Sequence, residues 1–248
     1  MSLKKRIFIV IERILACITD KIVCISEAEK NSAIIYKIAN KSKLELITNG
    51  IVISKVRDAE SIKKEDLGIP IDSYIVGMIG RLEFQKAPDV FVKAGKLIKK
   101  EIPNAVFIIV GNGDLTDEIK KYAYQNDLKL IITGWVDNPY SYLKLFDIAL
   151  LLSRWEGFGL AIAEYMAAEK NVIATRVDAI PTLIHDGVDG LLVEVDNPED
   201  VKEKVCYIFN HPIEAKYMRD HALAKVKTNY DIGRVVDQHI KMFEKLLS

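Results

Sequence analysis

Cysteine is scarce in this sequence, which holds only Cys17, Cys24 and Cys206 among its 248 residues. Three scattered thiols exclude a disulfide-based scaffold, and no Cys/His group has the spacing of metal ligands. An excess of one charge is also lacking, because 35 Lys and Arg balance 35 Asp and Glu. The chain therefore has no broad electrostatic footprint for nucleic acid, and we expect a reduced, cytoplasmic protein without a metal cofactor.

Long apolar runs are missing as well. The opening stretch "KKRIFIVIERILACI" resembles a signal peptide, but Glu12 and Arg13 interrupt a run that is already short. It predicts a helix that either packs on a core or lies on a membrane surface. Hydrophobic residues make up 50% of the chain, which excludes global disorder and is enough for a core in one or two domains.

From Tyr74 onward, apolar runs of strand length alternate with segments of helical period. The runs are "YIVGMIG", "AVFIIV", "LKLIIT", "DIALLLS", "NVIAT" and "GLLVEV". Continuous apolar strands separated by helices indicate a parallel sheet that is covered on both faces. The predicted fold is therefore α/β, a Rossmann-like doubly wound parallel sheet.

The chain upstream of this sheet is too small for a complete domain. "DKIVCIS" and "KLELITNG" predict two strands around a helix at 27–37, and two strands do not make a stable independent sheet. We expect four parts: the end of an incomplete N-terminal domain (1–50), a linker (51–72), a Rossmann-like domain (73–228), and a C-terminal helix (229–248). The last would pack back on the N-terminal segment or on a second copy of the chain.

The most informative stretch is "SRWEGFGLAIAEYMAA", which places Glu156 and Glu164 eight positions apart around Gly-Phe-Gly. A helix that starts near Gly159 would carry Glu164 in its second turn and leave Glu156 on the preceding loop. The backbone amides at such a positive helix end can bind an anion. A solvated helix residue beside a simple turn is the alternative.

Two cations follow the first apolar run in "GMIGRLEFQKAPDV". Arg81 and Lys86 come after Gly80, at the sheet edge where ligands of open parallel sheets bind. Arg offers a planar fork for phosphate and Lys a mobile point charge, although both are also common as solvated surface residues. With Glu156, Glu164 and the helix-end amides, they would form a site for a phosphorylated, hydroxyl-rich ligand.

The second run is followed by Gly111 and Gly113 in "VGNGDLTDEIKK". A dinucleotide-binding fingerprint would need a third glycine where Thr116 stands. A tight turn from strand to helix is the favoured use of these glycines, and a dinucleotide-dependent oxidoreductase is disfavoured. After the third run, Trp135 and Val136 either flank a nucleobase or cap the core.

With these residues in place, the chain resembles the C-terminal half of a retaining, nucleotide-sugar-dependent glycosyltransferase of the GT-B fold, in the family "glycosyl transferases group 1". The paired-Glu motif is the most specific part of the resemblance. "GRLEFQK", "VGNG", "IHDGVDGLLV", "VCIS" and "ITNG" support it, so that it extends from about residue 20 to the C-terminus.

The resemblance makes residues 73–228 a nucleotide-sugar-binding domain and implies a role for each candidate residue. Arg81 and Lys86 would bind the donor diphosphate, Glu164 the ribose, and Glu156 the hydroxyls of the transferred sugar. The remaining donor-binding candidates are Gly80, Gly111, Gly113, Trp135 and Val136, together with the amides of Phe158, Gly159 and Leu160. The family works without a metal and transfers sugar with retention of configuration, with Arg81, Lys86 and the helix-end amides stabilising the leaving group.

The resemblance also implies a lipid-linked, glycan or protein acceptor, and a lipid-linked one would place the protein peripherally at the inner membrane face. Ala87 replaces a usual glycine of the family. Asp178 and Ala179 replace a glycine pair, and Thr182 a glutamate. Because the family's acceptor domain is missing, we expect the chain alone to be inactive or weakly active. The alternative is a nucleotide- or sugar-binding module that requires a partner chain.

Overall fold

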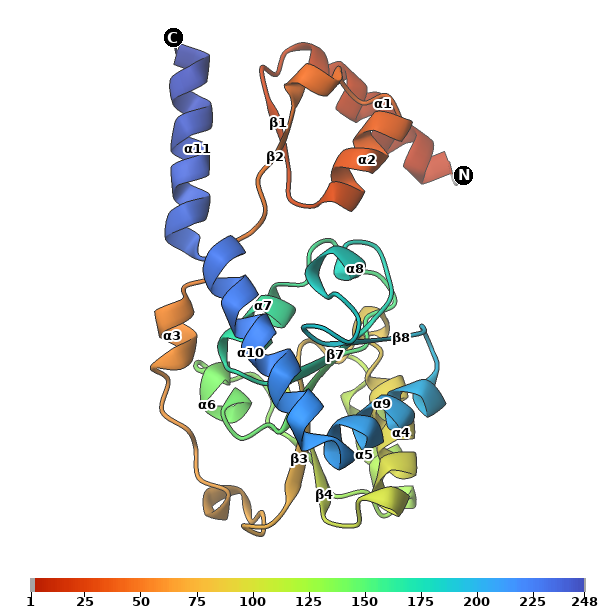
Figure 1. The fold of residues 1–248 in the computed structure, drawn as a ribbon. Helices are drawn as coiled ribbons and strands as arrows, with labels where there is room; N and C mark the ends of the chain where they lie inside the picture. Colours follow the sequence, from red (N-terminus) through yellow and green to blue (C-terminus); the bar gives the residue numbers. More distant parts are fainter. Residues whose placement is uncertain (1–2, 248) are drawn as a thin grey trace.

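The computed structural model describes residues 3–247, so residues 1, 2 and 248 of the expected terminal segments lie outside it. The larger part of the chain forms a parallel sheet of six strands in the order β5-β4-β3-β6-β7-β8 (Figure 1). The strands are β3 (Tyr74–Ile79), β4 (Ala105–Val110), β5 (Leu130–Ile132), β6 (Ile148–Leu151), β7 (Asn171–Thr175) and β8 (Leu191–Val193). All six apolar runs form the predicted strands, which confirms the doubly wound α/β fold.

The direction of winding reverses at β3. The chain runs outward from β3 through β4 to β5, and then returns to pair β6 with the other side of β3. The region beyond the carboxyl ends of β3 and β6 is therefore the topological switch point, where ligands of open α/β sheets bind.

Helices cover both faces of the sheet. They are α4 (Pro88–Glu101), α5 (Thr116–Gln125), α6 (Pro139–Leu143), α7 (Leu160–Ala167), α8 (Ile180–Leu183), α9 (Pro198–Asn210) and α10 (Pro212–Asn229), with a short 3-10 helix η3 (Phe84–Lys86). Successive side chains of β4 point to opposite faces, so Val106 and Ile108 join the core under α6 and α7, whereas Phe107 and Ile109 join the core under α4 and α5.

A smaller N-terminal part stands apart from this domain in Figure 1. It consists of α1 (Leu3–Cys17), β1 (Ile22–Cys24), α2 (Glu27–Ile35), a 3-10 helix η1 (Lys41–Lys43) and β2 (Leu44–Leu46). β1 and β2 form a two-stranded parallel sheet. The C-terminal helix α11 (Ile232–Leu247) rises beside them, and its buried Val235 and Met242 pack against Val23 and Ile47.

The polar segment 51–72 contains more structure than its composition predicts. It includes α3 (Ile53–Arg57) and a 3-10 helix η2 (Glu65–Leu67). Ile51, Val56 and Ile69 are buried in the core of the larger domain. The segment expected to be a linker is therefore packed on the larger domain over much of its length.

Candidate donor site at the switch point

The loop after β3 carries both predicted cations. β3 ends at Ile79, and Gly80 begins a loop that passes through η3 to the start of α4. The Arg81 guanidinium is exposed and donates to the side chains of Glu83 (3.0 Å) and Gln85 (3.4 Å) on its own loop. Arg81 thus lies at the predicted edge, with its charge turned toward its own loop and solvent.

Lys86 and Glu156 form the central contact of the site. Lys86 Nζ donates to Glu156 Oε2 at 2.5 Å, and only 18% and 13% of the two side chains are exposed. Ser153 Oγ donates to the same carboxylate oxygen at 3.1 Å. Because the pair joins the loop after β3 to the loop after β6, it spans the switch point of the sheet. A bound phosphate would compete with Glu156 for the Lys86 cation.

The helix predicted after the glycines begins at Leu160, directly beyond this ion pair. Gly159 precedes α7 with φ of 92°, in the left-handed region that favours glycine. A Cβ on Gly159 would also lie 2.9 Å from Ile180 Cδ1. The first turn of α7 holds no acidic residue, so no carboxylate of that turn offsets the partial positive charge of its backbone amides, which can bind an anion. Phe158 is buried, packed edge-on against Tyr230.

Arg154 joins the loop after β6 to the loop after β3, a role that the sequence did not indicate. Its guanidinium donates to both carboxylate oxygens of Asp89 at 3.0 Å and to the Phe84 carbonyl at 2.6 Å, and it lies over the Phe84 ring. The Arg154 N–H also donates to the Gln85 carbonyl at 2.8 Å. This clamp fixes the distance between the lysine loop and the glutamate loop.

Gly111 and Gly113 bring the loop after β4 against the loop after β3. A Cβ on Gly111 would lie 2.0 Å from the Gly80 carbonyl oxygen, and one on Gly113 would lie 2.5 Å from the Leu82 carbonyl oxygen. Thr116, in place of a third glycine, starts α5, and its hydroxyl bonds to Gly113. The glycines therefore serve close backbone packing in a strand-to-helix turn, the use that the sequence favoured.

Glu164 sits in the second turn of α7, as predicted. Tyr140 Oη, from α6, donates to Glu164 Oε1 at 2.9 Å. Burial raises the pKa of the Glu164 carboxyl, and the Tyr140 hydrogen bond only partly opposes this. The second oxygen of Glu164 stays available as an acceptor. Tyr140 was missed from the sequence because no local pattern links residues 24 positions apart.

Trp135 and Val136 occupy different environments after β5. Trp135 is 79% exposed, so it does not cap the core, whereas Val136 packs against the core under α6 and α7. An isolated bridge joins Gly111 to Gly134. This bridge holds the loop that carries Trp135 next to the loop after β4.

Two of the family departures fall at left-handed backbone positions. Ala87 has φ of 50° and Asp178 has φ of 43°. Few side chains adopt this region without strain, which explains why the family usually has glycine there. Asp178 compensates with a contact of its own, because its Oδ2 accepts from the Glu156 N–H at 2.8 Å. Thr182 Oγ1 donates to the Ala179 carbonyl at 2.6 Å.

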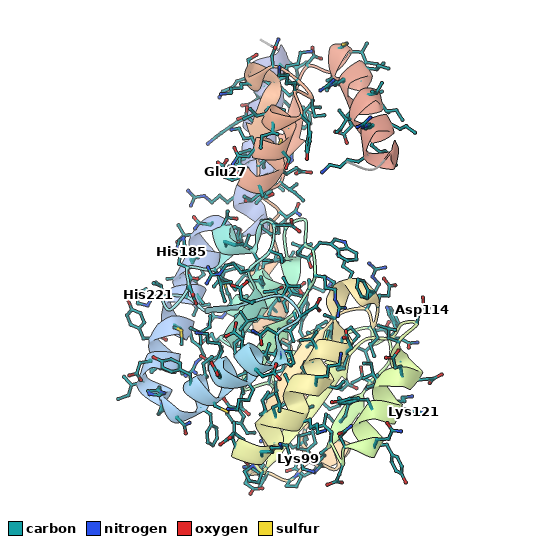
Figure 2. All side chains as sticks on the ribbon, turned by 90° about the vertical axis from the view of Figure 1, so that its right-hand side faces the viewer. Glu27, Lys99, Asp114, Lys121, His185 and His221 are labelled. Carbon is teal, nitrogen blue, oxygen red and sulfur yellow. The ribbon has the colours of Figure 1, made fainter. Side chains whose placement is uncertain are left out.

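Figure 2 shows His185 and His221 on one side of the molecule and Asp114, in the loop after β4, on the other. Among residues 3–247, no three His, Cys, Asp or Glu side chains form a group suited to a metal ion. No helix in the same range is long and apolar enough to cross a membrane.

Known structures share this fold. A glycosyltransferase from Rickettsia africae superposes with a TM-score of 0.84 at 24% identity, over 92% of this chain and 64% of that one. Anabaena Alr3699/HepE, crystallised in complex with UDP, gives a TM-score of 0.83 at 17% identity, over 91% of this chain and 64% of that one. The fold is thus that of the GT-B glycosyltransferases.

Sequence comparison identifies the family. The model of the family "Glycosyl transferases group 1" matches residues 59–225, and the chain therefore belongs to this family, as the paired-Glu motif predicted. UDP-Gal:alpha-D-GlcNAc-diphosphoundecaprenol alpha-1,3-galactosyltransferase of Escherichia coli is 28% identical over 229 residues, 89% of this chain. The chain spans 59% of the length of that enzyme.

Proposed function

We propose that this chain binds a uridine diphosphate sugar at the switch point of its sheet and serves as the donor-binding half of a glycosyltransferase. The Lys86–Glu156 ion pair supports the proposal, because it brings a cation suited to phosphate and a carboxylate suited to sugar hydroxyls together across the switch point. The amides of α7 adjoin it. Uridine is favoured as the base because the E. coli relative is named for UDP-Gal and the Anabaena protein was crystallised in complex with UDP.

Each residue has a role in this proposal. Lys86 and Arg81 neutralise the diphosphate, and the amides of Phe158, Gly159 and Leu160 bind phosphate or sugar. Glu156 accepts from hydroxyls of the transferred sugar.

The nucleoside lies on the other side of the diphosphate. Glu164, oriented by Tyr140, accepts from the ribose hydroxyls. Gly111 and Gly113 pack the loop after β4 against the loop after β3, so that both loops, with Gly80, border the donor, and Trp135 with Val136 flanks the base. No metal is needed in this arrangement, since the cations and amides supply the positive charge.

Transfer would proceed with retention of configuration. The acceptor oxygen attacks the anomeric carbon from the face that the diphosphate leaves, and the bond between that carbon and the β-phosphate oxygen breaks. The departing phosphate oxygen takes the acceptor proton. Lys86, Arg81 and the α7 amides stabilise the charge that develops on the diphosphate, a preorganised electrostatic role. Glu156 orients the donor and transfers no proton.

A lipid-linked glycan is the favoured acceptor. The E. coli relative is named for a diphosphoundecaprenol-linked substrate, which is an acceptor held at a membrane surface. By analogy, this chain would work peripherally at the inner membrane face in polysaccharide assembly. The acceptor site would come from a domain or partner beyond the 59% of the E. coli enzyme that this chain spans.

Calorimetric titration tests the proposal. UDP, GDP and ADP are each titrated beside the matching nucleoside, and we expect UDP to bind at least tenfold more tightly than uridine. Equal affinities for nucleotide and nucleoside would reject the diphosphate site. Tight UDP binding without sugar transfer to any lipid-linked acceptor would favour a nucleotide-sugar-binding module that acts only with a partner chain.

A further inference from the structure

The loop between β7 and α8 holds a residue whose conformation is costly and whose side chain reaches the donor site. Asp178 has φ of 43° although it is not a glycine. The turn around it is closed by a hydrogen bond from the Ile180 N–H to the Val177 carbonyl at 2.9 Å. Backbone strain of this kind persists where the surrounding contacts require it, and it is concentrated at functional sites.

The contact that Asp178 makes is specific. Its Oδ2 accepts from the backbone N–H of Glu156 at 2.8 Å, across 22 residues of sequence. The Glu156 carboxylate is held from the other side by Lys86 at 2.5 Å and Ser153 at 3.1 Å. Glu156 is therefore fixed at both its main chain and its side chain.

The glutamate loop is anchored before Glu156 by Arg154 and by Gln85, whose Nε2 donates to the Trp155 carbonyl at 3.1 Å, but it has open space directly after Glu156. Gly157 directly follows Glu156, and a Cβ there would meet nothing within 4 Å, so packing does not restrict the loop at that point. Glycine also allows more backbone conformations than other residues. The Asp178 carboxylate thus supplies a restraint that packing does not.

We propose that Asp178 is a positioning residue for the transferred sugar: its carboxylate anchors the Glu156 backbone and so fixes the Glu156 side chain toward the sugar hydroxyls. This inference rests on the proposed donor site and adds to it a residue that acts through Glu156. The restraint is a hydrogen bond accepted by an oxygen atom, so the negative charge of Asp178 is not required.

Three variants separate the anchor from the strain and the charge. Asp178→Asn keeps an acceptor oxygen and tolerates left-handed backbone, Asp178→Gly relieves the strain but loses the anchor, and Asp178→Ala loses the anchor and keeps the strain. We expect Asp178→Gly to melt at or above the wild-type temperature and yet to bind the sugar less well. A residue with a merely structural role would not separate stability from binding in this way.

The experiment measures the ratio of the dissociation constants of UDP-galactose, UDP-glucose and UDP-N-acetylglucosamine to that of UDP. For the sugar that the chain prefers, Asp178→Gly and Asp178→Ala should raise this ratio about tenfold, the effect of one lost hydrogen bond. Asp178→Asn should stay within twofold of wild type. In a Glu156→Ala background, Asp178→Gly should change the ratio no further, because the anchor acts through Glu156.

Amide hydrogen exchange gives a readout without ligand. The Glu156 amide should exchange faster in Asp178→Gly and at the wild-type rate in Asp178→Asn. An unchanged ratio, unchanged exchange, or an equal loss in Asp178→Asn would overturn the inference while leaving the donor site intact. Failure of the wild-type chain to bind UDP would instead reject the proposed function itself, and this inference with it.

Discussion

Replacing Lys86 by Met should weaken UDP binding far more than uridine binding. The substitution removes the cation but keeps an unbranched apolar chain of similar length in the site. Lys86 is only 18% exposed, so solvent would screen its bond to a phosphate little. A hydrogen bond to a charged group contributes about 1.5–3 kcal/mol. Loss of that bond corresponds to an increase of about 13- to 160-fold in the dissociation constant for UDP.

The same substitution leaves Glu156 without its cation. Its carboxylate is 13% exposed, and an unpaired carboxylate in that position costs about 1–3 kcal/mol of unfolding free energy. It also repels the diphosphate. Adding Glu156→Gln to Lys86→Met should therefore recover stability and part of the UDP affinity, which separates the ion pair from the phosphate contact.

Two further variants calibrate the measurement. Arg81 is 63% exposed and paired with Glu83, so Arg81→Met should cost less, about 1 kcal/mol or fivefold. Lys121 is exposed on α5, away from the switch point, and Lys121→Met should leave affinity unchanged. Calorimetry with UDP and with uridine gives the dissociation constants for the two Lys86 variants, Arg81→Met and Lys121→Met. Equal losses for nucleotide and nucleoside in Lys86→Met, or a comparable loss in Lys121→Met, would refute the diphosphate role.

Three other outcomes are expected. Burial raises the pKa of the Glu164 carboxyl, and protonation of this group removes an acceptor for the ribose hydroxyls. The preference for UDP over its 2′,3′-dideoxy analogue should therefore be smaller at pH 5 than at pH 7.5. Glu164→Gln should show a small preference at both pH values. Burial lowers the pKa of Lys170 to about 8 from 10.5, so the buried charge destabilises the folded state below pH 8 and this cost is relieved as pH rises toward 10.5. Relative to Lys170→Met, urea unfolding should show about 2 kcal/mol more stability at pH 9.5 than at pH 7.5. The same pH dependence in both proteins would contradict this. Gly111→Ala, whose Cβ would lie 2.0 Å from the Gly80 carbonyl oxygen, should lose at least about 3 kcal/mol of stability. Gly187→Ala has φ of 77° but open space around the new Cβ, and should lose only about 1 kcal/mol. Equal decreases in melting temperature would refute the packing role of Gly111.

The sheet was predictable because its signal is local. β4 is buried along its whole length, so every residue from Ala105 to Val110 is apolar, and each neighbouring strand shows the same continuous run. Positions after such strands fall at one sheet edge by topology alone. This is why Lys86 and Glu156 could be assigned to one site although 70 residues separate them.

The contacts that orient the site residues were not predictable. Tyr140 reaches Glu164 from another helix, Arg154 joins two loops, and Asp178 binds a backbone amide 22 residues away. Each depends on loop coordinates that carry no periodic signal. In the sequence, Asp178 stands out only because the related proteins usually have glycine there. The left-handed backbone at this position explains that preference for glycine. The sequence did not distinguish between a base contact and a core position for Trp135, and its exposure in the structure excludes the core.

An NMR titration of the isotopically labelled chain with UDP would locate the binding surface directly. We expect the amide signals of Gly80, Phe158, Gly159 and Leu160 to shift in proportion to bound UDP, while those of Lys121 and His221 stay in place. At a UDP concentration near the wild-type dissociation constant, these shifts should be strongly reduced in Lys86→Met. Unmoved signals at the α7 N-terminus, with shifts elsewhere or none at all, would contradict a nucleotide-sugar site at the switch point of this sheet.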